Sequence, residues 1–292
     1  MLRGLGGKSL TGMTNNWSTF QNKILERGKK LYRSFPWRDT KDAYEILISE
    51  VMLQQTQVKR VLNYWQSWLQ KFPSVQNLAA APLSYVLEAW QGLGYNRRAI
   101  NLHICANIIC EEHGGCIPTD SKALLALPGI GAATAAGVRV FAFSIPDIYI
   151  ETNVRTVIIH EFFADENNVS DKKIASVLAK LCPKDETCRE FYYALLDIGA
   201  DLKAQGIKSA RRAKAYTKQA KFEGSHRQKR SFLLRCVLDG ISDVEELTVC
   251  LNDEEQKAKR SALSMSEVKN ILLELQKEGF ITFTEDMVEI IM

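Results

Sequence analysis

The 292-residue sequence lacks the features that would place it in a membrane or a secretory pathway. A bilayer-spanning helix needs about 20 consecutive apolar residues, and no apolar run here approaches that length. The first thirteen residues contain glycine, serine, lysine and arginine without an apolar core, so they do not resemble a secretory signal. We therefore expect a cytoplasmic protein with no membrane partner, and a flexible leader over residues 1–14.

The sequence also lacks a cysteine framework. Its seven cysteines are scattered and odd in number, which argues against a set of disulfides. Most of them stand among apolar residues, as buried free thiols do in a reducing compartment. We predict no metal site.

The net charge of +4 is small, but it is distributed unevenly. Residues 231–292 contain thirteen acidic and six basic side chains, which leaves a net charge of +11 on the first 230 residues. Between Lys203 and Arg230, ten basic side chains accompany a single acid, Glu223. A basic body indicates a nucleic-acid partner, although such a run is also typical of a solvated helix face.

Strand-type patterning is nearly absent before residue 230, where apolar residues recur at helical spacing. The predicted helices span residues 17–32, 43–55, 58–72, 83–91, 97–113, 134–143, 153–163, 172–181 and 188–204. The sequence therefore predicts an all-α fold.

Residues 228–292 follow a different pattern. After helices predicted at 228–239 and 244–252, Ser264 and Glu267 form a capping box that opens a third helix. Phe280–Phe283 and Met287–Ile291 flank a short turn, which predicts a β-hairpin. Three helices and a hairpin make a winged-helix-like domain. Because it is acidic and its third helix carries few bases, we interpret it as packing against the body or binding a protein partner, ahead of binding DNA.

The run Leu127-Pro128-Gly129-Ile130-Gly131 stands between two predicted helices. Two glycines entered through a proline predict a tight turn that exposes backbone N–H groups. Those groups and the positive end of the next helix form an anion site. On a basic protein, we interpret that anion as a nucleic-acid phosphate.

Two further segments carry side chains suited to DNA. Ser49–Val58 ends in the tandem glutamines Gln54 and Gln55, whose amides both donate and accept and so suit a gap in base pairing. Glu50 precedes Gln54 by one helical turn, within reach of an extruded base.

In Gly92–Ala99, Leu93 or Tyr95 can wedge into a base stack, and Arg97 or Arg98 can contact phosphate. Taken alone, these segments are better explained as a core helix, a turn and a solvated helix start.

In this order and spacing, the segments resemble the helix-hairpin-helix (HhH-GPD) superfamily of DNA glycosylases, most of all its MutY-type adenine glycosylases. The matching segments are Phe35–Arg38, Ser49–Val58, Gly92–His103, Leu127–Gly131, Glu151–Val157 and Asp197–Ala200. The resemblance implies a two-lobed helical body over residues 15–227, with a helical bundle over 40–150 inserted between its N- and C-terminal helices, and the winged-helix-like domain over 228–292. It also implies base flipping and excision of adenine mispaired with 8-oxoguanine or guanine in double-stranded DNA, by a monomer associated with the nucleoid in a bacterium.

The resemblance assigns roles to individual residues. Glu50 matches the acid that protonates adenine, Glu151 falls at the position of the catalytic aspartate, and Asn153 matches an asparagine two residues later. Trp37 and Arg38 are expected to line the base pocket. The position of a Schiff-base lysine holds Ala133, which implies a monofunctional reaction. The implied DNA contacts are Gln54, Gln55, Leu93, Tyr95, Arg97, Leu127, Gly129, Gly131 and Thr134.

Three departures from the family pattern bear on function. Glu151 is one methylene longer than aspartate, which displaces its carboxylate by roughly 1 Å, enough to cost about 10²-fold in a site that has not adapted. The four cysteine positions of the family's iron–sulfur cluster hold Lys203, Ala210, Ala213 and Gln219, so we expect no cofactor. We interpret the basic run there as a helix that contacts DNA phosphate. The β-rich domain that reads 8-oxoguanine is replaced by the winged-helix-like one.

Two other interpretations stay open. Thr152 stands where MutY-type enzymes have glycine, which favours a glycosylase for mismatched thymine or uracil. A catalytically silent, lesion-binding DNA protein also fits the charge pattern.

Overall fold

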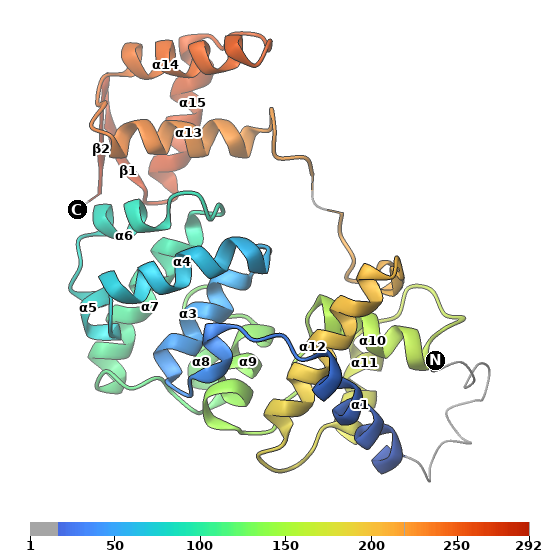
Figure 1. The fold of residues 1–292 in the computed structure, drawn as a ribbon. Helices are drawn as coiled ribbons and strands as arrows, with labels where there is room; N and C mark the ends of the chain where they lie inside the picture. Colours follow the sequence, from blue (N-terminus) through green and yellow to red (C-terminus); the bar gives the residue numbers. More distant parts are fainter. Residues whose placement is uncertain (1–16, 219, 292) are drawn as a thin grey trace. The chain divides into compact units, whose positions relative to one another are not determined.

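The computed structural model describes residues 17–218 and 220–291, and these are mainly helical (Figure 1). The chain forms two compact units. The first comprises Met1–Glu50, Thr119–Ala126 and Ile130–Lys218, and the second comprises Val51–Pro118, Leu127–Gly129 and Gln219–Met292. The main inserted stretch is therefore 51–118, shorter than the 40–150 expected from the sequence. The leader expected over residues 1–14 lies outside the described residues.

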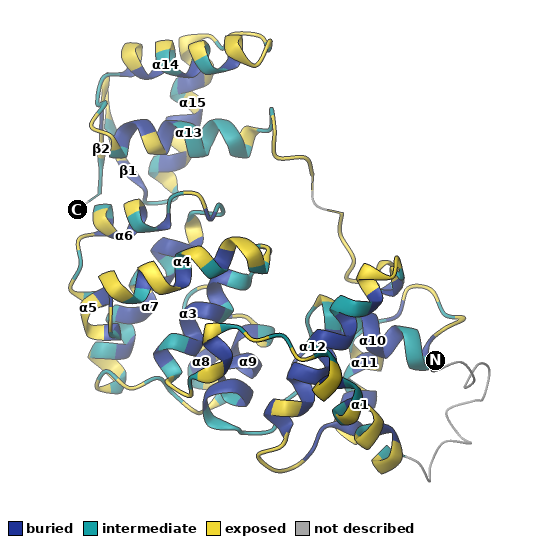
Figure 2. Ribbon diagram, viewed as in Figure 1, coloured by how far each residue is buried: buried dark blue, intermediate teal, exposed yellow. Residues whose placement is uncertain are grey.

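The first unit contains the helices that begin and end the body. They are α1 (Trp17–Leu31), α2 (Pro36–Asp39), α3 (Ala43–Leu53) up to Glu50, α8 (Ser121–Ala126), α9 (Ala132–Phe143), α10 (Thr152–Phe162), α11 (Asp171–Leu181), α12 (Cys188–Ala204) and the 3₁₀ helix η2 (Ser209–Arg212). Figure 2 shows that α9 and α12 are largely buried. A methyl group added at Gly28 of α1 would lie 2.2 Å from Cβ of Ala194, so α1 and α12 touch through small residues.

A buried ion pair fixes the segment after α1 against α12. Arg38 donates from both Nη atoms to Asp197, over 2.7 and 2.9 Å, and from Nη1 to the carbonyl of Arg33. Arg33 Nε adds a bond of 2.7 Å to the same carboxylate. Because Asp197 is fully buried, losing either partner would leave a costly unpaired charge.

The stretch after α12 is not the basic helix read from its charges. Between α12 and α13 (His226–Leu238), η2 is the only helix among the described residues. Arg212 organises this segment by donating to the carbonyls of Phe163 (2.7 Å) and Glu166 (3.3 Å) and to that of Ala164. Val169 pairs with Ala213 in an isolated parallel bridge, so backbone contacts complete the fold of this segment.

The second unit begins at the end of α3. It continues with α4 (Val58–Lys71), α5 (Val75–Ala79), α6 (Leu83–Trp90) and α7 (Arg97–His113), and ends with α13, α14 (Val244–Lys257), α15 (Met265–Lys277), β1 (Ile281–Thr284) and β2 (Met287–Ile290). In α4, Val61, Trp65 and Trp68 recur at helical spacing and are buried, which gives this helix its apolar face.

The C-terminal part of the second unit has the predicted three helices and hairpin. Ser264 and Glu267 form the predicted capping box at the start of α15. Strands β1 and β2 pair antiparallel, with Ile281 opposite Ile290 and Phe283 opposite Val288. Helix α14 extends to Lys257, five residues beyond the predicted end. Across residues 17–218 and 220–291, the structure has no helix with the length and apolar character to span a bilayer.

Candidate active site and DNA-contact residues

Glu50 occupies a notch in helix α9 that a glycine creates. A methyl group added at Gly137 would lie 2.2 Å from Glu50 Oε2 and 3.1 Å from Cε2 of Tyr149. No real Cβ tolerates such a contact, so Gly137 is needed for the Glu50 carboxyl to lie where it does. Apart from the small residues of that helix, no sequence pattern indicates this role.

Tyr149 joins Glu50 and Glu151 in the same site, although the sequence did not single it out. Residues 149 and 151 precede α10 in a segment without regular secondary structure, and the charge of Glu151 acts on the Tyr149 hydroxyl and raises its pKa. The Tyr149 hydroxyl is hydrogen-bonded to the Glu50 side chain. Its backbone N–H donates to the hydroxyl of Tyr192 over 3.1 Å, and that hydroxyl donates to the Asp147 carbonyl over 2.8 Å. The segment that carries the second acid is therefore fixed.

Glu151 is the N-cap of α10. Its Oε1 accepts hydrogen bonds from the backbone N–H of Asn153 (2.6 Å) and of Val154 (3.1 Å). The additional methylene lets the side chain fold back onto the helix start, where the exposed N–H groups attract an anion. The longer acid thus has a defined position and is not loose in the site.

The two carboxyls have different surroundings. Burial raises the pKa of Glu50 to about 8, helped by the charge of Glu151 and opposed by the hydrogen bond with Tyr149. Burial also raises the pKa of Glu151, whereas its two backbone hydrogen bonds and the charges of Lys203 and Arg155 lower it. Hydrogen bonds from N–H groups favour an ionised carboxylate. These surroundings favour a protonated Glu50 at neutral pH, whereas for Glu151 two backbone N–H groups partly offset the effect of burial on its pKa.

Asn153 follows Glu151 at the first turn of α10 and packs against α12. A methyl group added at Gly199 would lie 2.4 Å from the Asn153 carbonyl oxygen and 2.6 Å from its Cβ, so Gly199 allows this close approach. Asn153 Oδ1 is buried without a hydrogen-bond partner among the described residues. A buried acceptor without a partner is costly, and a hydroxyl or amine of a substrate would satisfy it.

Trp37 and Arg38, which the resemblance places in the base pocket, make contacts within the first unit. The Arg38 guanidinium is buried in its ion pair with Asp197 and lies 4.5 Å over the ring of Tyr193. Trp37 is buried and stacks on Phe35, with ring centroids 5.2 Å apart. Both side chains therefore stabilise the packing of the first unit.

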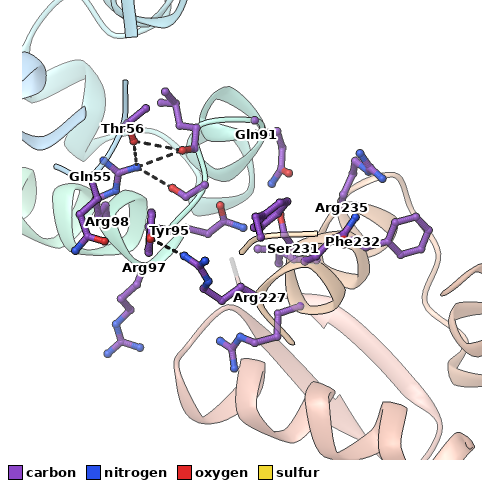
Figure 3. A pocket seen from close by; sticks show the side chains of 18 of the residues that line it. Gln55, Thr56, Gln91, Tyr95, Arg97, Arg98, Arg227, Ser231, Phe232 and Arg235 are labelled. Atoms are coloured by element: carbon purple, nitrogen blue, oxygen red, sulfur yellow. Dashed lines mark hydrogen bonds between the residues drawn. The ribbon is translucent and has the colours of Figure 1, made fainter. Parts of the chain in front are cut away.

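In the second unit, Arg98 links the two predicted DNA-contact segments. Its Nη1 donates to the carbonyls of Val51, Met52 and Gln54 at 2.8 to 2.9 Å. Its Nη2 donates to Thr56 Oγ1 over 3.0 Å and to the Gly94 carbonyl over 2.8 Å (Figure 3). Arg98 is thus the buried support of both segments, whereas Arg97, the arginine assigned to DNA, is exposed.

The side chains proposed to enter the base stack differ in exposure. Gln55 and Tyr95 both have left-handed backbone conformations, with φ of 55° and 52°, which strain residues other than glycine. Gln55 is exposed and Tyr95 half-buried. Leu93 is only 2% exposed, so it supports the loop from below and is not placed as a wedge.

The glycine-rich turn has the expected backbone. Gly129 has φ of +77°, and a methyl group there would lie 2.9 Å from Asn101, so only glycine fits. Gln54 Nε2 donates to the Gly129 carbonyl over 3.3 Å, which brings two predicted DNA-contact segments together. Gly131 is the exposed N-cap of α9, whose first N–H groups have no partner within the helix. Leu127 and Thr134 are buried, so they position this turn through packing.

The positions at which the resemblance implies an iron–sulfur cluster do not fit one. Lys203 lies in α12, Ala210 lies in η2 and Ala213 follows it; none of them can supply a thiolate. Gln219 lies outside the described residues. The Lys203 charge instead acts on Glu151, whose pKa it lowers.

Comparison with known proteins places these features in a family. Residues 48–184 match the model of the HhH-GPD superfamily base excision DNA repair proteins. The chain is 41% identical over 169 residues to the adenine DNA glycosylase of Mycolicibacterium smegmatis, which covers 58% of each protein. It is 34% identical over 194 residues to the adenine DNA glycosylase of Homo sapiens, which covers 63% of this chain and 36% of the human protein. The chain therefore spans less than two thirds of the length of these relatives.

Solved structures share the fold. A thermostable thymine-DNA glycosylase superposes with a TM-score of 0.59 and 29% identity, covering 65% of this chain and 88% of that one. A trapped endonuclease III–DNA covalent intermediate superposes with a TM-score of 0.53 and 22% identity, covering 62% and 84%. Residues 48–184 therefore match the HhH-GPD superfamily of base excision DNA repair proteins, and the helical fold around them is similar to that of the thymine-DNA glycosylase.

Proposed function

We propose that the protein is a monofunctional DNA glycosylase that excises adenine mispaired with 8-oxoguanine or guanine in double-stranded DNA. The observation that carries this proposal is the pair of half-buried acids, Glu50 with a raised pKa and Glu151 held by two backbone N–H groups. The curated relatives named above are adenine DNA glycosylases, which supports the choice of base.

The reaction divides between the two acids. Glu50, protonated at neutral pH, gives its proton to a ring nitrogen of the flipped adenine. The bond between C1′ and the base then breaks with its electron pair leaving on the adenine, and positive charge develops on the sugar. The Glu151 carboxylate stabilises that charge. Water adds to C1′ and loses a proton, which returns to Glu50, and an abasic site remains.

Other residues support this division. Asn153 Oδ1, buried without a partner in the described part of the chain, is the acceptor proposed to orient the nucleotide or the attacking water. Ala133 offers no amine for a Schiff base, so we propose hydrolysis without strand cleavage. We propose that the enzyme needs no iron–sulfur cluster, because the residues at the ligand positions cannot bind iron.

A panel of duplexes tests the proposal. Each duplex holds one A·8-oxoG, A·G, T·G or U·G pair, and alkali converts abasic sites into strand breaks. We expect breaks in the A·8-oxoG and A·G duplexes with the wild type, and none without alkali. Glu151→Gln keeps a cap acceptor but loses the charge, so it is expected to bind and not cleave. Tight binding with no breaks on any duplex would contradict the glycosylase activity and indicate a lesion-binding protein without catalysis.

A second candidate is a glycosylase for thymine or uracil mispaired with guanine. Thr152, beside Glu151, favours it, as does the structural likeness to a thymine-DNA glycosylase. Strand breaks confined to the T·G or U·G duplexes would establish this alternative and exclude adenine as the substrate.

A further inference from the structure

A large cavity opens within the second unit, beside the segments proposed to contact DNA (Figure 3). It has a volume of about 1140 Å³, and its walls are residues 54–57, residues 91–98 and one face of α13. Sites for small ligands usually measure about 300–1,000 Å³. This cavity is larger and open to one side, which suits a segment of a polymer.

The charge of the C-terminal helices is segregated, although their domain is acidic. Helix α13 carries Arg227, Lys229, Arg230 and Arg235 and no acid, whereas the 14 residues of α14 include five acids and one lysine. The face of α13 lines the cavity with Arg227, Arg230 and Arg235. The acidic average therefore hides one basic helix, which is turned toward the DNA-contact segments.

The acids of the cavity wall do not cancel this charge. Arg230 pairs with Glu274 and Glu278, each over 2.7 Å, so its charge is offset by these acids and we leave it out of the proposed phosphate contacts. Arg60 on α4 and Arg235 on α13 are exposed arginines of the wall. Aromatic rings stand beside them: Phe222 is 51% exposed, and Arg235 lies 5.2 Å over the ring of Phe232. Guanidinium groups beside exposed rings suit phosphates and bases together.

Arg227 connects α13 directly to the candidate wedge. Its guanidinium donates to the Tyr95 hydroxyl and lies 5.1 Å over the Tyr95 ring (Figure 3). Tyr95 has a strained left-handed backbone. The contacts with Arg227 restrain its ring to one orientation. The same arginine donates to the Ala220 carbonyl over 3.0 Å, which ties the chain before α13 to this contact.

We propose that α13 makes the C-terminal domain part of the DNA-binding surface, and that the cavity holds a segment of the duplex. Arg60 and Arg235 contact its phosphates, Phe222 and Phe232 offer ring faces, and Arg227 is a positioning residue for Tyr95. The proposal rests on the proposed function for the role of Tyr95. It selects DNA over an acidic protein segment as the occupant, because the cavity is continuous with residues 54–57 and 91–98.

The salt dependence of DNA binding tests the cavity. The full-length protein is titrated with a duplex that carries a stable abasic analogue, at several salt concentrations. Each phosphate contact contributes about 0.9 to the slope of log K against log salt. We expect Arg60→Ala and Arg235→Ala each to reduce the slope by about 0.9. Lys257→Ala, which removes an exposed base of α14 outside the cavity, is the control and should leave it unchanged.

Slopes for Arg60→Ala and Arg235→Ala that equal the control would overturn the cavity as a DNA site. An inactive protein whose slopes fall as expected would instead overturn the proposed function and leave this site standing. An active wild type whose Arg60 and Arg235 variants keep the wild-type slope would overturn the cavity as a DNA site and leave the proposed function standing. The two failures are therefore distinguishable.

A double-mutant cycle tests Arg227. Arg227→Ala is expected to weaken binding to the abasic-analogue duplex several-fold in the wild type, and by clearly less in a Tyr95→Phe background, where the hydroxyl it holds is missing. Rescue by Arg227→Lys should be partial, since lysine restores a donor but not the planar group over the ring. Equal losses in both backgrounds would show that Arg227 does not act through Tyr95.

Discussion

The acid site of the first unit and the DNA-contact loops of the second are built on opposite principles. Glu50 and Glu151 are surrounded by protein, and each is fixed by hydrogen bonds or by a close helix. Gln55 and Tyr95, in contrast, extend from left-handed positions that one buried arginine, Arg98, supports from beneath. The proposed chemistry thus needs two carboxyls in different surroundings, partly shielded from solvent. Insertion into DNA instead needs side chains that reach the surface from a rigid support.

Removing the proton of the acid site should have the largest effect. Glu50→Gln keeps the shape of the side chain but cannot donate a proton from a carboxyl group, so we expect a single-turnover rate lower by about 10²–10⁴-fold. Affinity for the duplex should stay near that of the wild type, measured by fluorescence anisotropy. A parallel loss of affinity would mean that the acid site also supports DNA binding. Chemistry and DNA contact would then not be divided between the two units.

Filling the notch in α9 should have the next largest effect. Gly137→Ala places a methyl group 2.2 Å from Glu50 Oε2, so the carboxyl must move. A shift of about 1 Å costs about 10²-fold in rate, and we expect that loss in single-turnover assays. Ala179→Ser, which adds an atom at an exposed position of α11 in the same unit, is the control. Equal rates for both variants would contradict the role given to Gly137.

Removing the support of the loops should lower stability before it lowers the rate of chemistry. Arg98→Met fills similar space but leaves the carbonyls of Val51, Met52 and Gly94 without this donor, which costs about 1–3 kcal/mol of unfolding free energy. Urea denaturation measures that loss, with the exposed Arg60→Met as control. DNA binding should weaken in the Arg98 variant, and the pH dependence of the bound enzyme should not change.

The smallest expected effect is a displacement along the pH axis. Glu50 acts as an acid, so kcat/KM should fall as pH rises through its pKa of about 8. The Tyr149 hydrogen bond lowers that pKa, so Tyr149→Phe should raise it and move the alkaline limb to higher pH. Tyr85→Phe, on an exposed ring of α6, should leave the limb in place. A limb that moves to lower pH would remove Tyr149 from the acid site.

The helices were largely readable from the sequence, because caps and apolar spacing mark them locally. The helix Arg97–His113 begins and ends where the pattern predicted, and Ser264 caps α15 as expected. The five-residue α5 (Val75–Ala79) was missed because so short a helix has no period to detect. The run after Lys203 was interpreted as a basic helix from its charges alone. Instead, Arg212 donates hydrogen bonds to the carbonyls of Phe163 and Glu166, and only the short 3₁₀ helix η2 forms there among the described residues.

The site was predictable only in part. Glu50, Glu151 and Asn153 stand together in the first unit, and their residue types carried the signal. Gly137 and Tyr149 were not found, because their roles depend on neighbours distant in sequence. The same limit applies to Arg38, Leu93 and Thr134. Each was assigned by its place in a motif, and each is buried in the structure.

The cap of α10 makes one of the acids a natural reporter of the reaction. Asn153 and Val154 donate their amide protons to the carboxylate that is proposed to meet the sugar. Any state in which that oxygen turns toward the sugar must lengthen those two hydrogen bonds. The amide resonances of these two residues would then record the progress of base excision at the helix itself, without a label on the DNA.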